Sequence, residues 1–354
     1  MRRLLRFVGL ALLCALAAPQ VEAAVSVNTL GGLNKPGVTT STLTEVWYSA
    51  TNGSDVNLGA TQATPIKTVA KLGQMFWGFG LSGAAILYVD APLSANEAAL
   101  FYQFSANDSR QWEIVDGSMP FTPKLRFSSR DINANGDGNV GFVNGTSYGS
   151  ATWKNLGSAG SGGNATLQTS TITYRSSVLT PSGRSTIPAF EFNGAAYFKT
   201  ASVGGITGPT TWLVVFKQTN GAAINRIVDG VSASTCGIEA LSGGSPQLLG
   251  YAGSSANLPT ITLNQFHGVV LGLNAGSPTA GQSSPAWIDG TTTTGTGLCG
   301  TNFAGGATIG SWNDGSVPFN GQILEVMLID GSGPSTDPSA WAQWIKYNFG
   351  ALPV

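Results

Sequence analysis

Apolar residues alternate with polar ones over much of the chain, and this alternation predicts β-strands. Ala189–Phe192 alternates and is followed by an Asn-Gly turn, whereas Thr211–Phe216 is an almost continuous apolar run, as in a central strand. Further strands are predicted, with Gly, Asn and Asp residues between them, at 196–198, 226–229, 247–251, 267–273, 286–289, 307–310 and 322–330. Many short strands separated by such turns predict an all-β sandwich.

One helix is predicted in this C-terminal part. Asp337 is its cap, Pro338 takes the first helical position and Gly350 ends it. The residues that form its apolar face are Trp341, Trp344, Ile345 and Phe349.

Nearer the N-terminus the pattern predicts a β-loop-α-β unit. Val46–Tyr48 is its first strand, a short helix ends near Trp77, and Ile86–Asp90 is its second strand. We predict an irregular arm over 24–44 and a small α/β or β cap over 45–120.

The loop of this unit contains Asn52–Gly59 and Thr64–Thr68, which resemble the opening segment of secreted right-handed β-helix proteins. The resemblance covers about 45 residues. No succession of similar coils follows, and a β-helix needs several stacked repeats to bury its faces. We therefore do not expect a β-helix domain.

Residues 1–23 are predicted to be a signal peptide. Arg2, Arg3 and Arg6 precede the apolar stretch Phe7–Ala18, which is too short to span a bilayer, and small residues favour cleavage before Ala24. The mature protein is then expected to be secreted, periplasmic or held at the cell surface.

Charge excludes some classes of partner. Without residues 1–23, which hold three of the 17 basic and one of the 18 acidic residues, 14 basic residues face 17 acidic ones. We expect neither nucleic acid nor membrane insertion, because the chain has no basic patch and no further apolar run of bilayer length. The low charged fraction of 10% and the 48 glycines suit short strands and tight turns. Oligomeric state cannot be derived from the sequence.

Two cysteines remain after cleavage, Cys236 and Cys299. An exported chain meets an oxidising compartment, so we predict that they form a disulfide. The alternative is a pair of buried thiols, since the sequence does not show whether their Cα atoms approach closely enough.

A possible calcium loop lies in the segment 125–138. Its oxygen-bearing side chains alternate as in the first half of an EF-hand loop and are Asp131, Asn133, Asn135 and Asp137, with Gly136 at the sharp turn. Phe142 stands where the bidentate Glu of an EF-hand would be. The segment fits either calcium as a cofactor or a turn held by Asx-type hydrogen bonds.

The order of motifs over the C-terminal two-thirds resembles the concanavalin A-like lectin/glucanase superfamily in its bacterial laminin-G-like form. The residues that carry the resemblance are Trp153, Asn155–Gly157, Pro188–Gly194, Tyr197, Phe198, Trp212, Arg226, Asp229, Phe266, His267, Trp287–Gly290, Ile309–Ser311, Phe319–Val326 and the closing helix. The resemblance implies an antiparallel jelly-roll sandwich over 121–354, with ligand contacts on a concave face or rim loops, often aided by calcium. It does not fix function, because the superfamily holds lectins, binding modules, adhesion modules, hydrolases and lyases.

Catalytic patterns are weak in this sequence. Retaining glycosidases need two carboxylates about 5 Å apart on one face, and the nearest pair, Glu113 and Asp116, falls on opposite faces of a strand. Glu325 is expected on one face of its strand with Ile323 and Met327. His267, the single histidine, starts an apolar strand and fits a packed ring better than a general base. Whether the protein is an enzyme stays open, with the balance against it.

Binding has more support. Trp312, Asn313 and Asp314 form a turn-like loop, and with Tyr251 they are the candidate ligand-binding residues, since an aromatic face beside amide and carboxylate oxygens can hold a sugar. The alternative is that Trp312 folds over the rim of the sandwich. The leading hypothesis is a secreted or surface-associated protein that binds carbohydrate or a surface glycoprotein. The alternatives are a structural or adhesive surface component that binds protein partners, and a polysaccharide-active hydrolase or lyase.

Overall fold

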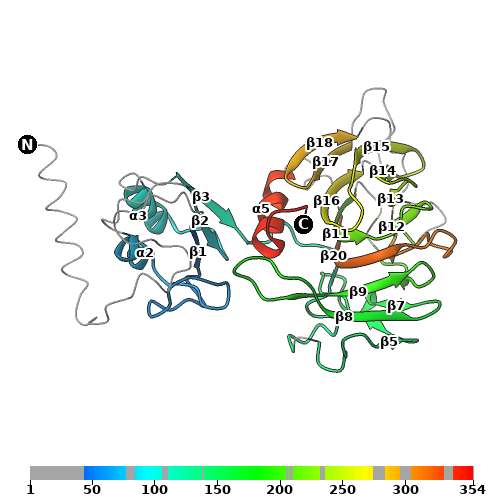
Figure 1. Cartoon of the computed structure of the whole chain (residues 1–354), viewed down its shortest axis with the longest axis horizontal. Helices are drawn as coiled ribbons and strands as arrows, with labels where there is room; N and C mark the ends of the chain where they lie inside the picture. The colour runs from blue at the N-terminus through cyan, green and yellow to red at the C-terminus, as the bar shows by residue number, and fades with distance from the viewer. Residues whose placement is uncertain are drawn as a thin grey trace, which may run out of the picture.

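The chain forms one small parallel sheet and two large antiparallel sheets, as the computed structural model shows (Figure 1). We call them sheet A, sheet B and sheet C. The structure describes residues 44–76, 84–105, 111–137, 139–204, 206, 210–231, 236–273, 284–295, 304–330 and 338–353. The predicted signal peptide over 1–23 lies outside these residues, as does the predicted arm except for residue 44.

Sheet A is parallel, in the order β1 (Thr44–Tyr48), β2 (Ala84–Val89) and β3 (Gln111–Asp116). Parallel neighbours need crossover connections, which helices α2 (Val69–Phe76) and α3 (Ala95–Ser105) provide. The buried apolar residues shared by strands, loop and helices are Val46, Tyr48, Ile66, Val69, Leu72, Leu87, Val89, Phe101 and Phe104. Of the two predicted alternatives for the cap, this part of the chain is therefore α/β.

The loop before α2 is held by Asp55. Its Oδ1 accepts hydrogen bonds from the amides of Lys67 and Thr68 at 3.0 and 2.9 Å, and its Oδ2 accepts one from the Thr68 hydroxyl at 2.8 Å. The Thr68 hydroxyl in turn accepts the Lys71 amide at 3.1 Å, as an N-cap residue does. The motif that resembles a β-helix opening thus folds back on the start of a helix.

Sheets B and C face each other as an antiparallel sandwich, so the predicted all-β fold class with a C-terminal helix is confirmed. Sheet B has the order β18-β17-β16-β11-β20-β9-β8-β5, with β4 beside β20, and sheet C has the order β15-β14-β13-β12-β19-β10-β7-β6. The strands of sheet B are β4 (Leu125–Ser128), β5 (Ser147–Tyr148), β8 (Ile172–Leu179), β9 (Ile187–Asn193), β11 (Thr210–Gln218), β16 (Phe266–Leu273), β17 (Ser284–Ile288), β18 (Thr291–Gly295) and β20 (Asn320–Asp330). Those of sheet C are β6 (Thr152–Trp153), β7 (Ala165–Leu167), β10 (Phe198–Thr200), β12 (Asn225–Asp229), β13 (Gly237–Ala240), β14 (Gln247–Tyr251), β15 (Ser255–Thr260) and β19 (Thr308–Ile309).

Strand β11 lies at the centre of sheet B and is buried on both faces. Trp212, Val214 and Phe216 point into the core between the sheets. Leu213 and Val215 point to the other face, into a second apolar cluster. Burial on both sides explains the continuous apolar run in the sequence.

That second cluster exists because α5 (Pro338–Phe349) covers the outer face of sheet B. Its buried residues include Trp341, Trp344, Ile345 and Phe349, as the sequence predicts. The helix ends before Gly350, whose φ is +84°. Asp337, the predicted cap, lies outside the described residues. Within the described parts of the chain, no helix is both long and apolar enough to cross a membrane.

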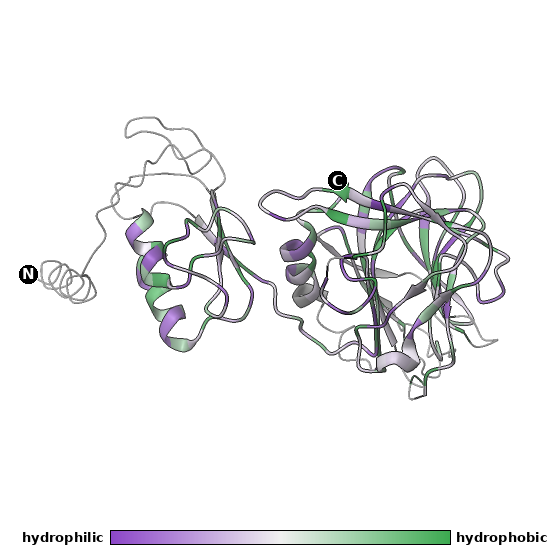
Figure 2. Ribbon diagram, turned by 90° about the horizontal axis from the view of Figure 1, so that it is seen from below, coloured by the Kyte–Doolittle hydropathy of each residue, from purple (hydrophilic) through white to green (hydrophobic). Residues whose placement is uncertain are grey.

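Sheet A and the sandwich meet at the C-terminal end of α5, and Figures 1 and 2 both place α5 on the side of the sandwich toward sheet A. Arg184 stacks on the rings of Trp47 and Tyr88, with 4.7 Å from its Cζ to each ring centroid. It also donates to the carbonyl oxygens of Lys346 and Tyr347, both at 2.6 Å. A cation at the end of a helix is favourable because the last carbonyls carry partial negative charge.

Strand β3 adds further contacts to this junction. Lys346 Nζ donates to Glu113 Oε1 at 2.7 Å, and Gln343 Oε1 accepts the amide of Asp116 at 3.0 Å. Glu113, half of the nearest carboxylate pair in the sequence, is therefore engaged between sheet A and α5.

Candidate functional site

The face of sheet C that points away from sheet B carries polar and aromatic side chains. Ile238 and Leu248 point into the core between the sheets, so Glu239 and Leu249 beside them point outward. On β12 the register shifts, so Ile227 and Val228 both lie in that core, and Arg226 pairs with Glu239. The strand registers join four of these outward residues in one row across β12, β13, β14 and β15: Arg226, Glu239, Leu249 and Asn257. Tyr251 lies two residues beyond Leu249 and so shares its face.

The 311–317 loop between β19 and β20 lies on this outer face. The amide of Gly315 donates to Trp312 O at 3.0 Å, and Gly315 has a φ of +83°, which closes a tight turn. Lys199 Nζ donates to Asn313 O at 2.6 Å, and the amide of Asn313 donates to Asp229 Oδ2 at 3.3 Å. The loop is therefore tied to β10 and β12 through its backbone.

Arg226 contacts two aromatic rings on this face. Its Cζ is 5.3 Å from the ring centroid of Trp312 and 5.4 Å from that of Tyr251, and both rings are half-buried. The side chain of Arg226 is 0% exposed, and its Nη1 is 3.4 Å from Glu239 Oε2. None of its three guanidinium nitrogens has a hydrogen-bond partner among the described residues. Each cation–π contact contributes about 0.5–2 kcal/mol, so the arginine fixes both rings.

Asp229 supports the same loop from below. Its Oδ1 accepts the amides of Gly230 and Cys236, both at 2.9 Å. Burial raises the pKa of the Asp229 carboxyl above its ordinary value, against the opposing effects of Arg226 and these amides. Cys236 is buried, and Cys299 lies outside the described residues, so the disulfide stays a prediction.

The four predicted ligand residues take different places. Trp312 and Tyr251 come together around the arginine, Asn313 anchors the loop, and Asp314 is exposed at the rim. The amide and hydroxyl of Ser316 donate to Asp314 Oδ1 at 2.9 and 2.6 Å and hold the pKa of that carboxyl below its ordinary value.

Sequence reasoning missed Glu239 and Lys199, and treated Arg226 only as part of the superfamily pattern. The residue types gave no signal, because charged residues in strands are common on solvated faces. Only the register of β12 with β13, which sets Arg226 opposite Glu239, brings them into one site.

The predicted calcium loop is held by its own hydrogen bonds. Asp131 accepts the amides of Asn135 and Gly136, both at 3.1 Å, and Asn135 Nδ2 donates to Asp137 Oδ2 at 2.7 Å. Asn133 belongs to the same loop and donates through Nδ2 to a backbone carbonyl at 3.1 Å. These are Asx-type contacts. Across the described residues, no group of three or more His, Cys, Asp or Glu could hold a metal ion. Calcium binding by oxygen ligands stays a prediction.

The two candidate catalytic groups have close partners. Glu325 is buried and accepts a hydrogen bond from Arg126 Nε at 2.8 Å. His267 Nδ1 is 2.5 Å from Asp289 Oδ2, and its Nε2 is 2.8 Å from Thr262 O. Both side chains therefore make structural contacts that join neighbouring segments.

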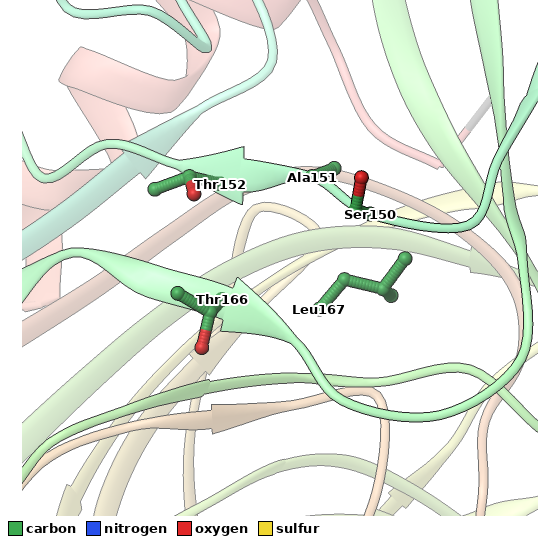
Figure 3. Close-up of a pocket in the computed structure, with 5 residues that line it drawn as sticks. All are labelled: Ser150, Ala151, Thr152, Thr166 and Leu167. Atoms are coloured by element: carbon green, nitrogen blue, oxygen red, sulfur yellow. The ribbon is translucent and has the colours of Figure 1, made fainter.

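A shallow depression of about 400 Å³ lies at the β6 edge of sheet C. Figure 3 shows the residues that line it: Ser150, Ala151, Thr152, Thr166 and Leu167. Thr152 and Thr166 are cross-strand partners, and Thr166 is paired in turn with Lys199. The depression is therefore linked by strand register to the residues beneath the 311–317 loop.

No protein-family model and no curated protein matches the chain. Among solved structures, it is similar to domain 4 of an extracellular GH43 arabinanase from Geobacillus stearothermophilus in complex with arabinotriose, at 16% identity and a TM-score of 0.37 over 60% of this chain and 94% of that domain. It is also similar to a CBM40 of an IT-sialidase from Ruminococcus gnavus bound to α2,3-sialyllactose, at 11% identity and a TM-score of 0.34 over 44% of this chain and 96% of that one. A sialidase from Trypanosoma rangeli is similar at 12% identity and a TM-score of 0.38, over 63% of this chain and 32% of the sialidase chain. The fold assignment rests on the strands and registers above.

Proposed function

We propose that this protein binds carbohydrate on the outer face of sheet C, with Trp312 and Tyr251 as its aromatic platforms. The observation that carries this proposal is that two half-buried rings from separate segments are fixed on one buried guanidinium. An aromatic face can stack on the apolar face of a sugar ring. The nearby carboxylates of Glu239 and Asp314 can accept hydrogen bonds from sugar hydroxyls.

The setting of this site is proposed to be extracellular. The predicted signal peptide supports a secreted or surface-associated protein, and the order of motifs supports a concanavalin A-like sandwich over 121–354. The ligand is then a polysaccharide or the glycan of a surface glycoprotein.

A polysaccharide pull-down and glycan array on the protein from Ala24 onward would test this function. The wild type should bind at least one glycan, and Trp312→Ala should weaken that binding about tenfold or more, as loss of a central aromatic contact does. Tyr102→Ala is the matched control, because Tyr102 on α3 is 73% exposed and far from this face in sequence and fold.

Running the pull-down and the array with calcium and with chelator would test the predicted metal at the same time. If the wild type binds no glycan, the result would contradict the proposal and favour the alternative of a surface component that binds protein partners.

A further inference from the structure

The two aromatic rings of the site both contact the Arg226 guanidinium. The Arg226 Cζ lies 5.3 Å from one ring centroid and 5.4 Å from the other. The rings come from different segments, the 311–317 loop for Trp312 and the end of β14 for Tyr251. A sugar ring is about as large as one aromatic ring, so each ring offers a platform for one sugar unit.

We infer that the ligand is a linear, uncharged saccharide chain, in which Trp312 stacks on one sugar unit and Tyr251 on another. This inference rests on the proposed function and names its ligand class. A terminal monosaccharide would use only one of the two platforms, whereas a chain that runs along the outer face of sheet C uses both.

Charge around the rings favours an uncharged chain. The two cationic groups of the site are engaged within the protein: Arg226 is buried and opposed by Glu239 at 3.4 Å, and Lys199 Nζ donates to Asn313 O at 2.6 Å. The Asp314 carboxylate is exposed at the rim. A uronate or sulfate group on the ligand would meet this carboxylate, which disfavours it.

Arg226 acts as a positioning residue. It is fully buried, so it does not touch the ligand, and its planar group contacts both rings. Glu239 compensates the buried charge, and the two ring contacts hold Trp312 and Tyr251 on one group. Lysine would keep the charge near Glu239 but not the flat surface.

Isothermal titration calorimetry with neutral oligosaccharides would test this inference. The ligands are chains of arabinose, xylose, mannose, galactose or glucose, each as a series from monomer to hexamer. At least one series should gain about tenfold or more in affinity between monomer and trimer. Trp312→Ala and Tyr251→Ala should each lower affinity for that hexamer about tenfold and flatten the dependence on length. Arg226→Lys should flatten it too, because lysine lacks the planar group that holds both rings. Tyr102→Ala should change none of these.

Three results would overturn the inference. The first is a monomer that binds as tightly as its hexamer. The second is loss of binding in Trp312→Ala while Tyr251→Ala binds as tightly as the wild type. The third is retention of polygalacturonate, hyaluronate or heparin in place of every neutral chain. Each of these results is compatible with the proposed carbohydrate function. If the wild type binds none of the neutral or acidic probes, both the inference and the proposed function are contradicted.

Discussion

Glu325 shows what a buried carboxylate does in this sandwich. It is 2% exposed, and Arg126, which pairs with it, is 28% exposed and also lies over the Trp344 ring of α5 at 5.7 Å from Cζ to centroid. The pair therefore links β20, β4 and α5. Loss of one partner of such a pair leaves a charge without compensation.

We expect Glu325→Ala to lower the free energy of unfolding by about 3 kcal/mol. Glu325→Gln should cost less, because its amide oxygen can still accept the Arg126 hydrogen bond. Urea unfolding of both variants would measure this. Equal stability of Glu325→Ala and the wild type would show that the ion pair makes no net contribution.

Asp229 gives a pH dependence with a defined sign. Burial raises its folded pKa above the ordinary value of 3.8. The folded protein then holds the proton at pH values where the unfolded chain has released it, so this group lowers stability as pH rises through that window.

Wild type should therefore lose stability relative to Asp229→Asn as the pH rises above 3.8, the ordinary pKa of this carboxyl. Chemical unfolding of both proteins at each pH would measure the difference. The opposite trend would show that the amides of Gly230, Cys236 and Asn313, with Arg226, outweigh burial.

Single residues of the site were partly predictable. Trp312 could be found because it sits in a turn-like sequence where an indole is half-exposed. Arg226 and Glu239 could not, because their meeting depends on the register of β12 and β13, and no local sequence feature sets that register.

At the scale of elements, the long apolar strands were predictable and the irregular ones were not. β8 was missed because its pairing with β9 shifts between Arg175 and Leu179, which breaks the alternation. β15 was missed because only Ala256 and Leu258 are buried in it, beside a proline.

A bulge also corrects the expected surroundings of Glu325. The register of β20 with β11 shifts by one residue there, so Ile323 points into the core between the sheets while Leu324 and Met327 point toward α5. The prediction that Ile323 and Met327 share a face was wrong, because a bulge reverses the side-chain order beyond it.

For the whole molecule, the Arg184 junction determines whether sheet A unfolds with the sandwich. We expect Arg184→Ala to separate one calorimetric transition into two, with sheet A melting first, because both ring stacks and both carbonyl contacts are lost together.

Arg175→Ala is the control for this change. Arg175 pairs with Glu191 on sheet B and is 41% exposed, so its loss should lower the free energy of unfolding by no more than about 1 kcal/mol and leave a single transition. One transition in Arg184→Ala as well would show that sheet A is coupled to the sandwich by other contacts.

The junction also sets an order of events during biosynthesis. Asp116 at the end of sheet A and Gln343 in α5 are 227 positions apart. Arg184 can reach the Trp47 and Tyr88 rings before α5 is made, but Tyr347 of α5 also packs against these rings, and the face of sheet B that α5 later occupies stays uncovered until then. A chain that ends before α5 therefore leaves both surfaces incompletely covered and accessible to chaperones and proteases.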